Sequence, residues 1–215
     1  MIGRSRLLSA AAAVGGLAVA LPAYACPPAA KPPAPRHVFV INLENKGYAA
    51  TFGPGSEAPY LSRTLRAQGV LLTQYHGTAH NSLPNYLAQI SGQGPDPEQQ
   101  ADCQIYSSFT QVGTAAHQQA VGRGCVYPAS VPTLPGQLTA KGLSWKGYME
   151  DMGADPTRES ATCGHPGINT RDNTQQATVK DQYAARHNPF VYFSSITGRR
   201  PARSGTSTWA SSPVT

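Results

Sequence analysis

Two short polar clusters carry residue types suited to phosphorus chemistry. Glu44 and Asn45 directly follow an apolar run, and the segment 81–85 (NSLPN) opens an apolar helical pattern. A carboxylate and an amide carbonyl are hard oxygen ligands for a divalent cation. A hydroxyl at a helix start, here that of Ser82, faces any anion that the helix N-terminus attracts. Together the clusters predict hydrolysis of a phosphoester.

Regular structure has to position these clusters, and strand and helix patterns alternate along the chain. Strands are predicted at 36–43, 70–75, 144–149 and 189–196, and helices at 58–68, 83–90, 134–141 and 178–186. The first strand is nearly continuous in apolar residues, which is typical of a strand covered on both faces in an α/β sheet. Ser82 is expected at the N-cap of the second helix, with Pro84 in its first turn.

Length and composition indicate one loop-rich domain. The chain has 215 residues, 40% hydrophobic and 13% charged, with 21 glycines and 19 prolines. Residues 1–25 have the basic, apolar and small-residue parts of a secretory signal peptide. A Pro-rich spacer is expected at 26–35, the domain at 36–196, and a disordered Arg- and Ser-rich tail at 197–215.

The signal peptide predicts a secreted protein. Its apolar stretch is shorter than the ~20 residues that span a bilayer. The alternative is a lipoprotein on the outer face of the membrane, anchored through an acylated Cys26.

The net charge of +6 does not indicate a nucleic-acid partner. Five of the 17 basic residues lie in the signal peptide or the tail, so 12 basic residues face 11 acidic ones between residues 26 and 197. The body of the protein is therefore close to neutral and lacks the surplus that polyanion binding requires.

After export, oxidising conditions favour disulfides over a zinc site. Cys103 and Cys125 enclose a polar, Gly- and Gln-rich part of the irregular stretch 93–129, and they are predicted to pair. Cys163 has no obvious local partner.

Four segments resemble the phosphoesterase family of bacterial acid phosphatases and phospholipases C, a branch of the alkaline phosphatase superfamily. They lie between residues 36 and 193 and read HVFVINLENKGY, GVLLTQYHGTAHNSLPNYLAQISGQ, GLSWKGYMEDM and HNPFVYF. The similarity is greatest to small secreted acid phosphatases. It implies an alkaline-phosphatase-like three-layer α/β sandwich with a central, mostly parallel sheet.

The resemblance also implies site residues. Glu44 and Asn45 correspond to ligands of a divalent metal ion, which is Ca, Mg, Mn or Zn, and Ser82 corresponds to the nucleophile that forms a phosphoseryl intermediate. Five further residues are candidate phosphate contacts or proton donors. These are Asn85, Lys146, His187, His80 and His165. Lys146 and His187, which belong to matched segments, rank above His37, His76 and His117.

The chain departs from the family after Phe193. Full-length relatives carry, further along, an acidic pair that completes the metal site and usually another cysteine, and neither occurs here. The Arg- and Ser-rich end suggests an early stop or a frameshift, which would leave the sheet incomplete and Cys163 without its partner.

The expected function is that of a secreted, metal-dependent and monomeric phosphoesterase acting on small phosphorylated substrates. The alternatives are a phospholipase C-type phosphodiesterase acting on phospholipid head groups, and a truncated, inactive pseudoenzyme.

Overall fold

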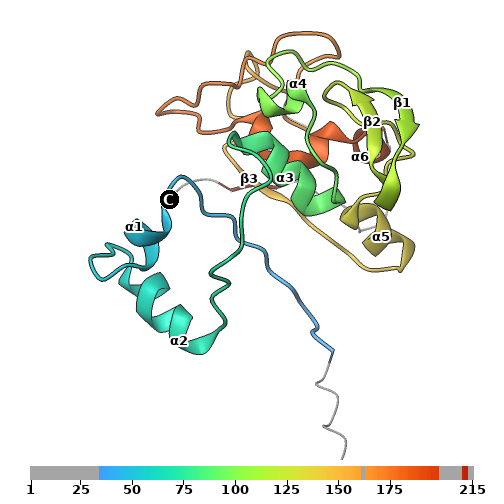
Figure 1. The fold of residues 1–215 in the computed structure, drawn as a ribbon. Helices are drawn as coiled ribbons and strands as arrows, with labels where there is room; N and C mark the ends of the chain where they lie inside the picture. The colour runs from blue at the N-terminus through green and yellow to red at the C-terminus, as the bar shows by residue number, and fades with distance from the viewer. Residues whose placement is uncertain (1–33, 161–162, 199–209, 213–215) are drawn as a thin grey trace, which may run out of the picture. The chain divides into compact units, whose positions relative to one another are not determined.

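The computed structural model describes residues 34–160, 163–198 and 210–212 (Figure 1). The chain divides into two units, Met1–Val70 and Leu71–Thr215. The predicted signal peptide, Cys26 and most of the Pro-rich spacer lie outside the described residues. No helix in the described ranges is long and apolar enough to cross a membrane.

Between residues 34 and 70, the described part of the first unit, the regular structure is helical. It contains α1 (Tyr48–Phe52), the π-helix η1 (Tyr60–Leu65) and α2 (Arg66–Gln68). The last two form one continuous helical segment, which confirms the helix predicted at 58–68.

The strands predicted at 36–43 and 70–75 are wrong. Both segments are irregular, and Phe39 and Val70 are 83% and 89% exposed. A strand exists only when a second strand accepts and donates its backbone hydrogen bonds. Among the described residues, neither segment takes part in a sheet or a β-bridge.

The second unit is built around α3 (Ser82–Ser91), the green helix of Figure 1. Leu83, Leu87 and Ile90 recur at helical spacing and are buried, while Gly92 ends the helix in the left-handed conformation (φ 71°) that glycine adopts without strain. The helix contacts α4 (Pro97–Gln100), α5 (Leu134–Ala140), and the 3₁₀ turns η3 (Ala185–His187) and η4 (Pro189–Tyr192). The helices predicted at 83–90 and 134–141 are therefore confirmed.

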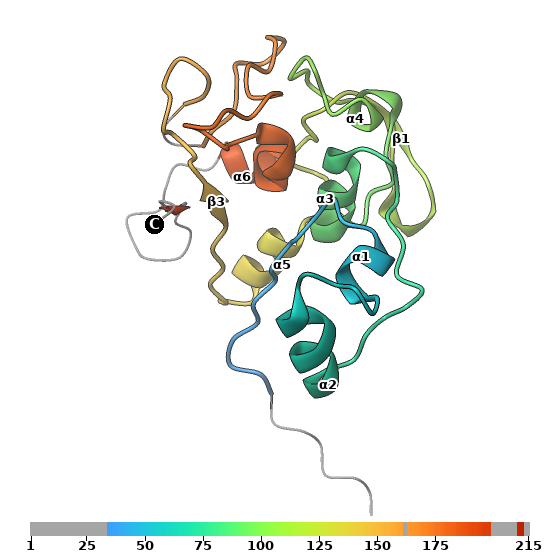
Figure 2. The same ribbon diagram turned by 90° about the vertical axis from the view of Figure 1, so that its left-hand side faces the viewer.

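Two small sheets occur in the described part of this unit. The antiparallel hairpin of β1 (Thr110–Thr114) and β2 (Ala120–Arg123) is joined through the 3₁₀ turn η2 (Ala116–Gln118), in a stretch predicted to be irregular. Every residue of β1 is exposed. Its sequence therefore lacks the alternation of apolar and polar residues by which a half-buried strand is predicted. The parallel pair of β3 (Tyr148–Glu150) and β4 (Ala210–Ser212) is seen in the turned view of Figure 2. The mixture is compatible with an α/β phosphoesterase.

The segment 178–198 differs most from expectation. The helix predicted at 178–186 is wrong, because only η3 forms there. The strand predicted at 189–196 is also wrong, because η4 and α6 (Ser194–Thr197) replace it. Pro189 has no N–H for a ladder, and Tyr192 and Phe193 are fully buried in an aromatic core, where Phe193 stacks on Tyr127 at 5.2 Å.

Candidate functional site

The start of α3 carries the predicted nucleophile. Asn81, and not Ser82 as predicted, is the N-cap residue, and Ser82 is the first helical residue. The Asn81 side chain does not cap the helix, because its Nδ2 donates to the Gln100 carbonyl at 2.8 Å. Asp102 takes over that role, since its Oδ1 accepts the Leu83 amide at 2.9 Å. A carboxylate 19 residues away thus replaces the local cap.

Asp102 is itself firmly held. It precedes Cys103, which forms a disulfide with Cys125, the pairing predicted from the sequence. Gln175 Nε2 donates to the Asp102 carbonyl at 2.8 Å, and Arg186 Nε lies 3.9 Å from Asp102 Oδ2. From the sequence, Asp102 is expected to be an exposed carboxylate in a loop. Its position next to Cys103, a predicted disulfide cysteine, is the one feature that could have indicated that it caps α3.

The Ser82 side chain is half-buried at this position. Within the part of the chain that the structure describes, its hydroxyl makes no hydrogen bond. A hydroxyl on the first residue of a helix that forms no hydrogen bond with another described residue is available to attack an electrophile.

Asn85 fixes the loop that leads into α3. Its Oδ1 accepts the amide of Thr78 at 2.7 Å and that of Ala79 at 3.3 Å, while its Nδ2 donates to the carbonyls of Ala79 and Asn81 at 3.0 and 2.7 Å. Both amide hydrogens are therefore used inside the protein. The same loop carries His80, which is exposed two residues before Ser82.

The turn η3 brings two basic residues to α3. The ring of His187 packs against that of Tyr86, with 5.6 Å between centroids, and Tyr86 lies one helical turn after Ser82. Arg186, the preceding residue, faces Asp102. The second unit thus gathers Ser82, Asn85 and His187 around the first turns of α3. Arg186 was missed because nothing in the sequence distinguishes it from other surface arginines.

Two other predicted contacts have different surroundings. The exposed Lys146 lies over the ring of Tyr148, with its Nζ 5.1 Å from the centroid. His165 stacks on Tyr106 at 5.1 Å, and the two rings line an open pocket of about 360 Å³. Within the described residues, neither side chain forms a hydrogen bond with Ser82.

Glu44 and Asn45 belong to the first unit, whereas Ser82 belongs to the second. Both are exposed, and Asn45 adopts a left-handed φ of 63°. Their oxygens suit a hard divalent cation in donor chemistry. No group of three or more His, Cys, Asp or Glu that could hold a metal occurs in the described ranges.

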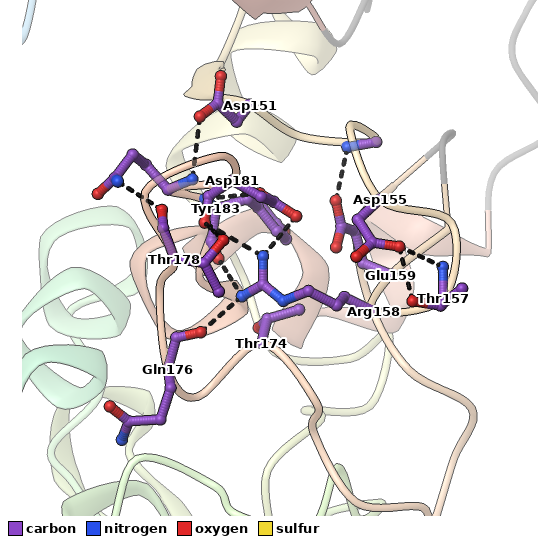
Figure 3. Close-up of polar contacts among 12 residues, drawn as sticks. Asp151, Asp155, Thr157, Arg158, Glu159, Thr174, Gln176, Thr178, Asp181 and Tyr183 are labelled. Atoms are coloured by element: carbon purple, nitrogen blue, oxygen red, sulfur yellow. Dashed lines mark hydrogen bonds and ion pairs between the residues drawn. The ribbon is translucent and has the colours of Figure 1, made fainter.

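A buried arginine cluster, consisting of Arg158, Glu159 and Asp181, lies elsewhere in the second unit (Figure 3). Arg158 pairs with Asp181 and donates to the carbonyls of Gln176 and Tyr183 at 2.8 and 3.1 Å. Burial raises the pKa of Glu159. Arg158 and Asp181 pair with each other, and Glu159 Oε1 accepts the Gly153 amide at 2.9 Å, which are structural roles.

Comparisons with known proteins point to one family. The profile of the phosphoesterase family matches residues 55–201. An acid phosphatase of Aspergillus fumigatus is 27% identical over 161 residues, which cover 74% of this chain and 27% of the relative. A phosphate-repressible acid phosphatase of Penicillium chrysogenum is 28% identical over 159 residues, or 73% and 28%.

A phosphatidylinositol-3-phosphatase of Mycobacterium tuberculosis is 27% identical over 183 residues, which cover 85% of this chain and 44% of the relative. The chain therefore spans less than half the length of these curated relatives. No solved structure matches it.

Proposed function

Because the chain belongs to the phosphoesterase family, we propose that it hydrolyses phosphoric esters in the manner of an acid phosphatase, with Ser82 as nucleophile. The observation that carries this proposal is the Ser82 hydroxyl, which starts α3 without a hydrogen bond to any described residue. The substrate class is small phosphomonoesters. The Mycobacterium relative is a phosphatidylinositol-3-phosphatase, which extends the proposed class to phosphorylated inositol head groups.

The proposed reaction has two displacements at phosphorus. The Ser82 oxygen attacks the phosphorus, the bond to the ester oxygen breaks, and the alcohol leaves with a proton while phosphoserine forms. Water then attacks the phosphoserine, which releases inorganic phosphate and restores the hydroxyl. His187, packed on Tyr86 one turn along α3, is the proposed carrier of the proton.

Glu44 and Asn45 are the proposed holders of a divalent metal ion. When bound, such an ion neutralises phosphate charge and acts as a Lewis acid. The secreted location and the three-layer α/β sandwich that the family implies are parts of the same proposal.

The test compares the wild-type chain with Ser82→Ala on p-nitrophenyl phosphate, each with and without a chelator. Loss of the nucleophile is expected to lower kcat roughly a thousandfold or more. Ser91→Ala is the matched control, because Ser91 lies at the other end of α3 and bonds the Leu87 carbonyl at 2.6 Å. Equal turnover by wild type and Ser82→Ala would contradict the serine mechanism, and an inactive wild type would contradict the proposed function. Activity that persists in the presence of the chelator would contradict the proposed dependence on a divalent metal ion.

A further inference from the structure

We infer that Asp102 is a positioning residue for Ser82, held in register by the Cys103–Cys125 disulfide. This inference rests on the proposed function and deepens it. It starts from the hydrogen bond between Asp102 Oδ1 and the Leu83 amide, 2.9 Å long.

That hydrogen bond constrains the backbone next to the nucleophile. The Leu83 N–H belongs to the same planar peptide group as the Ser82 carbonyl. Fixing its direction fixes ψ of Ser82, and with ψ the orientation of the helical turn from which the Ser82 side chain projects. Pro84 has no N–H, so the Leu83 amide is a main point at which the first turn of α3 can be held from outside.

The local alternative to this cap is not used. Asn81 occupies the N-cap position, where its side chain would ordinarily accept an amide hydrogen, yet its Nδ2 is directed to the Gln100 carbonyl. Both interactions tie the start of α3 to the segment 100–102. The helix start is thus set by a distant loop rather than by its own residues.

The loop that carries Asp102 is rigidly built. Asp102 and Cys103 both have left-handed φ values, 57° and 49°, which for residues other than glycine persist only when the surroundings impose them. The disulfide, the bond from the Asp102 amide to the Gln99 carbonyl at 2.9 Å and the bond from the Cys103 amide to the Glu98 carbonyl at 2.9 Å impose them here.

Arg186 completes the arrangement electrostatically. Its Nε lies 3.9 Å from Asp102 Oδ2, on the oxygen that does not cap the helix, and both side chains are mostly buried. The carboxylate therefore has one oxygen for the Leu83 amide and one for the guanidinium.

The experiment measures kcat and KM separately for wild type, Asp102→Ala and Asp102→Asn on p-nitrophenyl phosphate. Asp102→Ala removes the acceptor and is expected to lower kcat roughly tenfold to a hundredfold by misplacing Ser82. KM should change little. Asp102→Asn keeps an oxygen for the Leu83 amide and should restore most of kcat, which a loss of general stability would not predict.

Thr133→Ala provides a matched control. Thr133 Oγ1 caps α5 by accepting the Gly136 amide at 3.1 Å, so this variant also loses a helix cap in the second unit. It should lower the unfolding temperature and leave kcat per folded molecule at the wild-type value.

A second readout separates this inference from the proposed function. Hydrogen exchange of the Leu83 amide should accelerate in Asp102→Ala and stay slow in Asp102→Asn. Wild-type kcat in Asp102→Ala, an equal loss in Asp102→Asn, or unchanged Leu83 exchange in Asp102→Ala would each overturn the positioning role. An inactive wild-type chain would overturn the proposed function instead.

Discussion

The buried carboxyl group of Glu159 makes the stability of the protein depend on pH. It is 4% exposed, its Oε1 accepts the Gly153 amide at 2.9 Å, and its Oε2 has no hydrogen-bond partner among the described residues. Burial raises its pKa above the ordinary 4.5, and the nearby Asp181 charge adds to the shift. The folded protein therefore binds this proton more tightly than the unfolded chain does.

The sign of the pH effect follows. The stabilisation from Glu159 is fully present below pH 4.5 and is lost as the pH rises toward the higher pKa of the folded state. Glu159→Gln cannot titrate but keeps an acceptor for Gly153. In thermal unfolding from pH 4 upward, the unfolding temperature of Glu159→Gln should rise relative to that of the wild type as the pH increases. Parallel curves would refute this assignment.

Residues with a local signature could be predicted from the sequence, and those defined by distant contacts could not. Pro84, two residues after Ser82, marks the helix start, and the Cys103–Cys125 pair encloses a segment predicted to be irregular. The role of Ser82 as nucleophile stays a prediction. Asp102 and Arg186 are separated by more than 80 residues, and only the folded chain brings them together at α3.

At the scale of elements, Arg158 ties together the irregular stretch 176–183 that precedes η3. Its guanidinium bonds the carbonyls of Gln176, Asp181 and Tyr183 and pairs with the Asp181 carboxylate (Figure 3). A planar group with five donors is suited to such a fork. The Arg158 side chain thus satisfies backbone carbonyls that, in regular secondary structure, would accept hydrogen bonds from backbone amides.

Removing this arginine should be costly. Arg158→Met leaves the Asp181 carboxylate, 2% exposed, without its cation, and we expect a loss of about 3–5 kcal/mol in the free energy of unfolding. Urea unfolding measures it. The double variant Arg158→Met with Asp181→Asn should lose less than the single change, since no buried charge remains.

A matched control uses an exposed ion pair. Arg123 and Glu98 lie 2.7 Å apart with the Arg123 side chain 69% exposed, so Arg123→Met should change stability only slightly. Equal losses in Arg123→Met and Arg158→Met would argue against a special role for the buried pair.

At the same scale, the helices predicted at 58–68, 83–90 and 134–141 formed and the one at 178–186 did not, while among the predicted strands only 144–149 overlaps a strand, β3. The helix at 83–90 has its periodicity and its glycine stop in sequence, which suffice for a local structure. The runs at 36–43, 70–75 and 189–196 have the composition of strands, but a strand depends on a partner that composition does not specify.

For the whole molecule, the important feature is the apolar surface of residues 38–43. Val38, Phe39, Val40, Ile41 and Leu43 are each at least 66% exposed. A contiguous run of exposed β-branched and aromatic residues favours pairing with another chain.

We therefore expect association that grows with protein concentration. Ile41→Lys should reduce it, because a charge in the run opposes pairing. Thr73→Lys adds the same charge at an exposed polar position and should have little effect. Sedimentation velocity over a range of concentrations measures the outcome, and a wild-type chain that stays monomeric throughout would contradict the expectation.

The covalent link between Cys103 and Cys125 has a practical consequence for producing the protein. Two electrons from glutathione or thioredoxin would open it in the cytosol of an expression host, and the peptide that carries Asp102 would lose its anchor. Material made under reducing conditions should then contain a loosened start of α3. Oxidative refolding, or synthesis in the periplasm, should give a more uniform preparation.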